Sequence, residues 1–234
     1  MKMKEFTERH HAYIAAVFYQ LLLEHFGKRG ERAFIMATQR YGEQRGSRMA
    51  QRAIRDGKPL NFFSYKEYGE WVNTTSVMEE MGGNQSEEIS YAPDYQIKVT
   101  VCPWARQFAD MGMQKCGALY CRHIDKSIAR GFNPELVYEV PQNMNDEAYC
   151  IQILRGANFE PGKIPASKPE RRKDFSYHCA HIYYTFSDII ISIFGEEGEE
   201  IAQAVFTSFE EQYGEDMAAR LLDYEETDFN LIDA

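Results

Sequence analysis

Residues His10–Arg52 read HHAYIAAVFYQLLLEHFGKRGERAFIMATQRYGEQRGSRMAQR, and residues His178–Arg220 read HCAHIYYTFSDIIISIFGEEGEEIAQAVFTSFEEQYGEDMAAR. The two segments align without a gap, and 14 of their 43 positions are identical. Average residue frequencies would give about three identities by chance. Two unrelated amphipathic helix pairs would share apolar positions, but that does not explain matched glycines at three positions. We therefore predict an internal duplication, with two independent helix pairs of similar pattern as the alternative.

Each copy has the pattern of a helix, a Phe-Gly break and a second helix. The break at Gly27 or Gly195 supplies the left-handed residue that ends the first helix. A later glycine, Gly46 or Gly214, lies near the middle of the second helix and predicts a kink or a close helix crossing. Two such hairpins can pack about a pseudo-twofold axis. A swapped dimer could use the same surfaces, so a homo-oligomer stays an open alternative.

The segment between the copies carries the strand signals. Strands are predicted at 87–93, 95–101, 137–140 and 149–154, and helices at 63–73, at 103–111 and from the break at Gly112 to about Arg130. We expect an α+β fold in which a small antiparallel sheet is covered by the two duplicated helical hairpins. A single domain, 1–234, would then consist of an N-terminal hairpin (1–57), the sheet with cysteine-bearing helices (58–155), a loop or flap (156–173), a C-terminal hairpin (174–222) and an acidic tail (223–234).

Composition excludes several classes of partner. The formal net charge of −10 repels phosphate backbones, so we expect no nucleic-acid partner. We expect no membrane partner either, because no basic amphipathic face is apparent and the apolar stretch 12–23 is too short to span a bilayer. That stretch also lacks the small-residue cleavage site of a signal peptide. Five cysteines, an odd number, favour reduced thiols and therefore a cytoplasmic location.

Cys102 is the first candidate for chemistry. It leaves a predicted strand and precedes Pro103, a favoured first residue of a helix, so its thiol is expected at a helix N-cap. Unpaired backbone N–H groups and the helix dipole at that place would lower the pKa of the thiol. The same helix end could bind a carboxylate or an oxyanion. The alternative is a small buried residue at the end of a strand.

Two further cysteines lie on predicted elements beside polar residues. Cys121 and Asp125 are four residues apart on one helix, so they share a face and could orient a thiol or water, or bind one metal. Cys150 lies in a strand on the same side as Gln152. Core packing is the alternative for both cysteines, and Cys116 is interpreted as a core residue.

The motif HCAH contains His178, Cys179 and His181 at a predicted helix start. His178 and His181 are neighbours on the helix surface, but a structural zinc site needs four ligands and no C-x-x-C pair is present. His178 matches His10 in the first copy, which favours a structural role. Cys179 and His181 differ from their counterparts, so an asymmetric function could reside there.

Three motifs of this chain resemble the L-2-amino-thiazoline-4-carboxylic acid hydrolase family. They are CPW at 102–104, YCRHIDKSIARGFNP at 120–134 and, after a polar turn, YCIQI at 149–153. The resemblance covers about residues 90–155, and at the turn this chain has Asn145-Asp146-Glu147 where the family pattern has Gly-Asp. It implies a hydrolase acting on non-peptide C–N bonds that opens a small cyclic amidine or thiazoline-type carboxylic acid.

The same resemblance implies that Cys102, Cys121, Asp125 and Cys150 form the functional cluster. Cys102 would be the nucleophile and Asp125 would orient water or transfer a proton. Cys121 and Cys150 would shape the site or ligate a metal. The residues that we expect to bind the small-molecule acid are Trp104, Arg106, Arg122, His123 and Arg155.

Two other functions fit the same residues. One is a non-catalytic domain that binds or senses a small molecule with the same pocket. The other is a metalloprotein: no cofactor is certain from the sequence, but a divalent metal would have Cys121, Asp125, Cys150 and His178 as its ligands.

Overall fold

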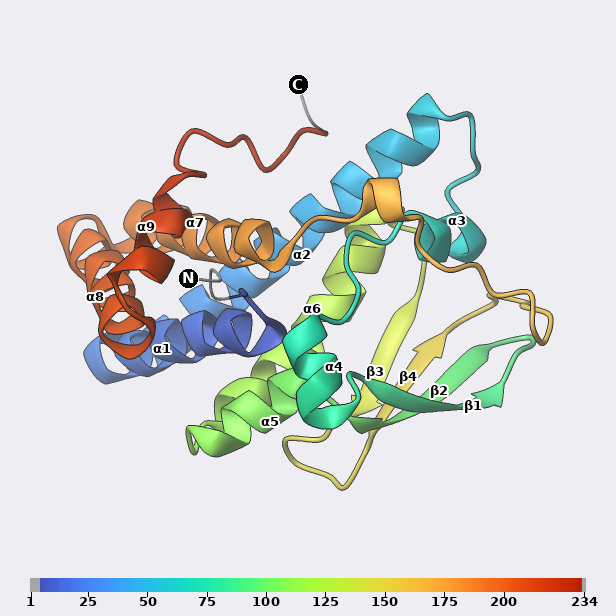
Figure 1. Ribbon diagram of the computed structural model, residues 1–234, viewed down its shortest axis with the longest axis horizontal. Coiled ribbons are helices and arrows are strands. Elements are labelled where there is room, and N and C mark those ends of the chain that lie inside the picture. Colours follow the sequence, from blue (N-terminus) through green and yellow to red (C-terminus); the bar gives the residue numbers. More distant parts are fainter. Residues whose placement is uncertain (1–4, 233–234) are drawn as a thin grey trace.

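The computed structural model describes residues 5–232, and Figure 1 shows helices gathered at one end and a small sheet at the other. This arrangement confirms the predicted α+β class. The elements in chain order are α1 (Glu8–Phe26), α2 (Lys28–Arg55), α3 (Phe62–Glu67), α4 (Thr75–Met81), β1 (Gln85–Ser90), β2 (Tyr95–Val101), α5 (Pro103–Asp110), α6 (Gln114–Phe132), β3 (Tyr138–Gln142), β4 (Cys150–Leu154), a 3₁₀ turn (Pro169–Arg171), α7 (Phe175–Phe194), α8 (Glu196–Tyr213) and α9 (Glu215–Leu222).

The hairpins α1/α2 and α7/α8 have the same turn geometry. Gly27 (φ 53°, ψ −128°) and Gly195 (φ 62°, ψ −132°) separate the paired helices in one shared conformation. Three residues later, a Cβ on Gly30 or Gly198 would lie 1.9 or 2.5 Å from a carbonyl oxygen of the preceding helix. The close approach of the two helices therefore requires glycine at both matched positions. The duplication itself stays a prediction.

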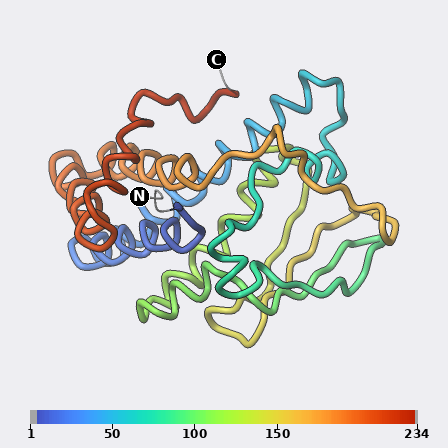
Figure 2. The backbone as a smooth tube through the Cα atoms, viewed as in Figure 1, coloured from blue at the N-terminus to red at the C-terminus, as the bar shows by residue number. Residues whose placement is uncertain are grey.

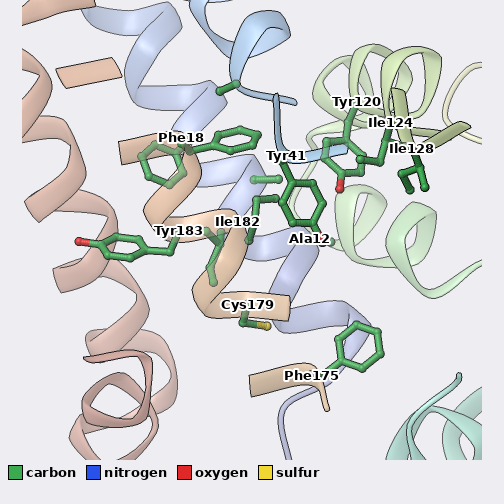
Figure 3. Packing of buried hydrophobic residues seen from close by; sticks show 14 of the residues in the cluster. Ala12, Phe18, Tyr41, Tyr120, Ile124, Ile128, Phe175, Cys179, Ile182 and Tyr183 are labelled. Carbon is green, nitrogen blue, oxygen red and sulfur yellow. The ribbon is translucent and has the colours of Figure 1, made fainter. Parts of the chain in front are cut away.

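The core of the helical end is formed where the two hairpins pack together. Phe26 and Phe194, which end the first helix of each hairpin, stack with their ring centroids 3.8 Å apart. Further inside, the rings of Phe18 and Phe186 lie 5.3 Å apart. Figure 3 shows this core continuing past Tyr41 towards α6 through Tyr120, Ile124 and Ile128.

The second helices of the two hairpins differ at their matched glycine. Helix α2 runs unbroken through Gly46 and crosses α6 closely there, because a Cβ on Gly46 would lie 2.0 Å from the carbonyl oxygen of Ile128. Gly131 of α6 makes the reciprocal contact with Glu43 of α2. At the matched position in the second hairpin, Gly214 has φ 97° and separates α8 from α9. The predicted close crossing therefore occurs in the first hairpin, whereas in the second hairpin the helix ends at Gly214 instead of kinking there.

Substituting Gly46 by Ala is expected to destabilise the fold by about 1–3 kcal/mol, because the added methyl group must push α2 and α6 apart. Urea denaturation would measure the loss. The matched control is Gly69→Ala, whose Cβ would meet its nearest neighbours at an ordinary 3.5 Å. Equal midpoints for the two variants would show that the crossing tolerates a methyl group.

The sheet has the strand order β1-β2-β4-β3, and every neighbouring pair is antiparallel, as predicted. Ile97 pairs with Gln152 and Val99 with Cys150, which fixes the faces of β2 and β4. Helix α6 contacts the sheet through β3 and packs most extensively on α2. Helix α7 packs on α8, α2 and α1, and α8 packs on α7 and α1. The second hairpin thus lies at the far end of the molecule from the sheet (Figure 1), and the expectation that both hairpins cover the sheet directly was wrong.

The predicted helix 63–73 is shorter than expected, and α4 was not predicted. Helix α3 ends at Glu67, and Gly69 follows its C-cap. The N-terminus of α4 is capped by a residue that is distant in sequence, because the carboxylate of Glu5 accepts hydrogen bonds from the backbone N–H groups of Thr75 and Ser76. A cap supplied over such a sequence distance leaves no local signal.

No helix within residues 5–232 has both the length and the apolar character needed to cross a bilayer.

Candidate functional site

A cavity of about 390 Å³ lies between the inner face of the sheet and helices α2, α3, α5 and α6. The segment between β4 and α7, predicted as a loop or flap, contributes Pro165 and Ser167, and Figure 2 shows it running from the sheet back to the helical end. The polar side chains that line the cavity are Arg45, Lys66, Glu70, Asn84, Ser86, Asn143, Asn145, Gln152, Asp125 and the thiols of Cys102, Cys121 and Cys150. The structure thus brings together all four residues of the predicted functional cluster.

Cys102 is the N-cap of α5, as Pro103 in the next position predicted. Burial raises the pKa of its thiol to about 11, although the backbone N–H groups of Ala105 and Trp104 oppose that shift. The expected low pKa was therefore wrong: the helix end is present, but loss of solvation outweighs it. The thiol is protonated at neutral pH and needs a base in order to react.

Asp125 is the carboxylate that shares the cavity with the thiols. Burial raises its pKa to about 6, and the positive charges of Arg45 and Lys66 limit that rise. Gln152 Nε2 donates a hydrogen bond of 3.5 Å to Asp125 Oδ2, and Tyr138 donates one of 2.7 Å to Gln152 Oε1. This chain holds the amide group of Gln152 towards the carboxylate. A carboxylate with a pKa near 6 is ionised at neutral pH and can still exchange a proton there.

Cys121 and Cys150 complete the group of thiols. Burial raises the pKa of Cys150 to about 12 and raises that of Cys121 well above its ordinary value. Asn145 Nδ2 donates a hydrogen bond of 3.5 Å to the sulfur of Cys121. Asn145 packs on Gly117, where a Cβ would lie 2.1 Å from its side-chain oxygen. The turn residue at which this chain departs from the family pattern therefore enters the cavity.

Aromatic side chains form the remaining walls. The Trp71 and Trp104 rings meet edge to face with centroids 5.1 Å apart, and Trp104 Nε1 donates a hydrogen bond of 3.0 Å to His11. Tyr65, Tyr120 and Tyr138 line the cavity from α3, α6 and β3. Rigid aromatic walls of this kind suit a small flat ring. Among the predicted binding residues, Trp104 lines the cavity.

The other predicted binding residues lie outside the cavity lining. Arg106 pairs with Asp110, Arg122 lies 3.9 Å from Asp146, and Arg155 binds both Glu139 and Asp94. These three arginines are on the surface, where nearby carboxylates occupy them. His123 contacts Gln39 on α2, and partial burial lowers its pKa to about 4. None of these four residues lines this cavity, although Arg106 lines an adjoining hollow that also reaches Cys102.

The four predicted metal ligands do not come together in the structure. Cys121, Asp125 and Cys150 line the cavity, but His178 lies outside its lining, with Nε2 3.4 Å from the carbonyl oxygen of Glu70. Within residues 5–232, no group of three or more His, Cys, Asp or Glu side chains is spaced to hold a metal ion. Cys179 and His181 are also fully buried, in the helical core. The HCAH motif therefore belongs to the packing of α7.

Arg45 and Lys66 are the two positively charged cavity residues, and neither was predicted from the sequence. Arg45 lies on α2 and Lys66 on α3, and both line the cavity. A signal for Arg45 was present, because Arg45, Arg48 and Arg52 recur with the spacing of the buried face of a helix. A stripe of arginines on such a face predicts a buried site for negative charge.

The model of the L-2-amino-thiazoline-4-carboxylic acid hydrolase family matches residues 7–150, which is more than half of the chain. The protein belongs to this family. The matched region contains Cys102, Cys121 and Asp125 and ends at Cys150, so it covers the whole predicted cluster. The second hairpin lies outside the matched region. No curated protein and no solved structure matches the chain significantly.

Proposed function

We propose that this protein is a cysteine-dependent hydrolase that opens the ring of a small cyclic amidine or thiazoline-type carboxylic acid. One observation carries the proposal. The Cys102 thiol and the Asp125 carboxylate, whose pKa is about 6, both line the same aromatic-walled cavity. The family name points to the same class of substrate.

Ring opening would begin with attack by Cys102 on the ring carbon that lies between nitrogen and sulfur. Because the pKa of the thiol is about 11, Asp125 takes its proton as the sulfur–carbon bond forms. The backbone N–H groups of Ala105 and Trp104 stabilise the charge that develops on sulfur. In the amidine tautomer whose C=N bond is exocyclic, the ring nitrogen already carries one hydrogen. Asp125 returns the proton to this nitrogen, which leaves as an amine as the ring C–N bond breaks, and the exocyclic C=N bond remains in the covalent intermediate.

Hydrolysis of the covalent intermediate would complete the reaction. Asp125 takes one proton from the attacking water, and the other passes to the exocyclic imine nitrogen. The water oxygen becomes the carbonyl oxygen of the product. The carbon–sulfur bond to Cys102 then breaks, and the sulfur recovers its proton from Asp125. The net change is the addition of one water to the ring, so the enzyme returns to its initial state.

As part of the same proposal we place the reaction in the cytoplasm, supported by five cysteines without disulfide bonds.

The test is to incubate the protein with cyclic amidine, thiazoline and hydantoin-like acids and to follow ring opening by mass spectrometry. We expect Cys102→Ala to abolish turnover, whereas Cys116→Ala, which removes a buried thiol outside the cavity lining, should retain it. Full activity of Cys102→Ala would eliminate the nucleophile role. If no ring is opened but ligands still stabilise the fold, the protein is a binding or sensing domain instead.

A further inference from the structure

Arg45 is a buried cation whose nearest carboxylate is already occupied. Glu70 accepts hydrogen bonds from Arg48 at 3.1 and 2.8 Å and from Arg52 at 2.6 Å. The closest approach of Arg45 to Glu70 is 3.9 Å, from Nε, which is buried and has no hydrogen-bond partner. Arg45 is 7% exposed and lines the cavity. Within residues 5–232, Arg45 therefore brings a positive charge and at least one donor without a partner to the wall of the cavity.

Lys66 is a second cation without a carboxylate partner at the cavity. Its amine sits 5.5 Å from the centre of the Tyr95 ring. The adjacent carboxylate, that of Glu67, pairs with Lys168 and Arg171 instead. Burial lowers its pKa, whereas the charges of Asp125 and Glu88 raise it. Glu88 lies outside the cavity lining and accepts hydrogen bonds from the hydroxyls of Tyr91 and Tyr95. Lys66 is thus held at the cavity by packing and by distant charge.

The charges that face the cavity do not balance. Its charged lining residues are Arg45, Lys66, Glu70 and Asp125, and Glu70 is already neutralised by Arg48 and Arg52. Counting Arg48 and Arg52, four cations face two carboxylates, which leaves an excess of two positive charges when Asp125 is ionised. Buried charges need partners, so an anionic ligand would offset part of this excess. Guanidinium and ammonium groups together are suited to a carboxylate.

We propose that Arg45 and Lys66 form a subsite for the carboxylate of a small monoanionic ring acid, which holds the ring between the aromatic walls and against Cys102 and Asp125. This inference rests on the proposed function and extends it, because it assigns the selection of acids over neutral rings to two named residues. Asp125 offsets part of the positive charge and lies close enough to sense both cations.

Binding of two unreactive rings tests the subsite separately from turnover. Thiazole-4-carboxylate and thiazole-4-carboxamide have nearly the same shape and differ in charge, and calorimetry in phosphate-free buffer gives both affinities. We expect the wild-type protein to bind the acid at least tenfold more tightly than the amide. Lys66→Gln and Arg45→Gln should each lower the affinity for the acid at least tenfold and change that for the amide less than twofold.

Matched controls remove the same charges from the surface. Lys58→Gln, in the exposed turn after α2, and Arg55→Gln, at the exposed end of α2, should leave the preference for the acid unchanged. Should Arg45→Gln fail to fold, the half-buried Lys66 still provides the test. A wild-type protein that binds neither ring, or binds both equally, overturns the subsite, and so does a Lys66→Gln variant that keeps the preference. Acid preference without ring opening of any substrate would retain the subsite and reject the hydrolase.

Discussion

Asp125→Asn is expected to lower kcat for ring opening by about 10²–10⁴-fold, the usual contribution of a positioned general acid or base. Asparagine keeps the shape and the hydrogen-bonding capacity towards Gln152, but it cannot take the proton of the Cys102 thiol. Because the pKa of that thiol is about 11, very little thiolate is available at neutral pH without a base. The loss should therefore appear in kcat, measured by steady-state kinetics.

The proposed role of Asp125 also predicts how kcat/KM changes with pH. A base acts in its ionised form, and the pKa of Asp125 is about 6. The value of kcat/KM should therefore fall as the pH drops below about 6 and reach a plateau above it. This acid limb should be absent from the residual activity of Asp125→Asn. A limb that persists unchanged in the variant would assign the titration to another group.

Two measurements separate loss of chemistry from loss of structure. A raised pKa means that folding disfavours the ionised form of Asp125, so the neutral asparagine should not destabilise the protein above pH 6. Asp146→Asn is the matched control, because Asp146 is an exposed aspartate whose nearest cation, Arg122, lies 3.9 Å away. It should leave kcat unchanged. Wild-type rates in Asp125→Asn would remove Asp125 from the mechanism.

Local periodicity made part of the site predictable. Pro103 places Cys102 at a helix N-cap, the four-residue spacing places Cys121 and Asp125 on one face of α6, and strand alternation places Cys150 with Gln152. These relations depend on the geometry of one helix or one strand, so the sequence contains them. The convergence of the three elements on one cavity is tertiary. It was suggested by the resemblance to a family and not by any spacing.

Long-range charge pairing was not predictable in the same way. The sequence led us to expect that Arg106 and Arg155 bind the small-molecule acid, but surface carboxylates bind both of them. Whether an arginine is free depends on carboxylates that the fold brings close from distant parts of the chain. Arg155, for example, is bound by Asp94, which is 61 residues away. The pKa of Cys102 was misjudged for a related reason, because a helix end can be recognised in sequence but the depth of its burial cannot.

Glu70→Gln is expected to destabilise the protein by about 3–5 kcal/mol, as removal of one partner from a buried ion pair commonly does. Glu70 is fully buried and binds Arg48 and Arg52 directly, with Arg45 at 3.9 Å. The amide would leave three buried arginines without a counter-ion. Urea denaturation at pH 7 measures the loss. Glu43→Gln, which breaks the exposed pair with Arg130, should cost less than about 1 kcal/mol.

The effect of Glu70 on stability should depend on pH in a defined direction. Burial would raise its pKa, but the charge and hydrogen bonds of Arg48, with the charges of Arg45 and Arg52, lower it from 4.5 to about 2. A carboxylate with a lowered pKa contributes its full stabilisation above pH 4.5 and loses it as the pH falls towards 2. The difference in unfolding free energy between wild type and Glu70→Gln should therefore be constant from pH 7 to 5 and shrink below 4.5.

Buried His11, His178 and His181, whose pKa values are lowered, also destabilise the protein in acid, but both proteins contain them, so the comparison isolates Glu70. A difference that stays constant down to pH 3 would mean that the side chain acts through its shape and hydrogen bonds rather than its charge.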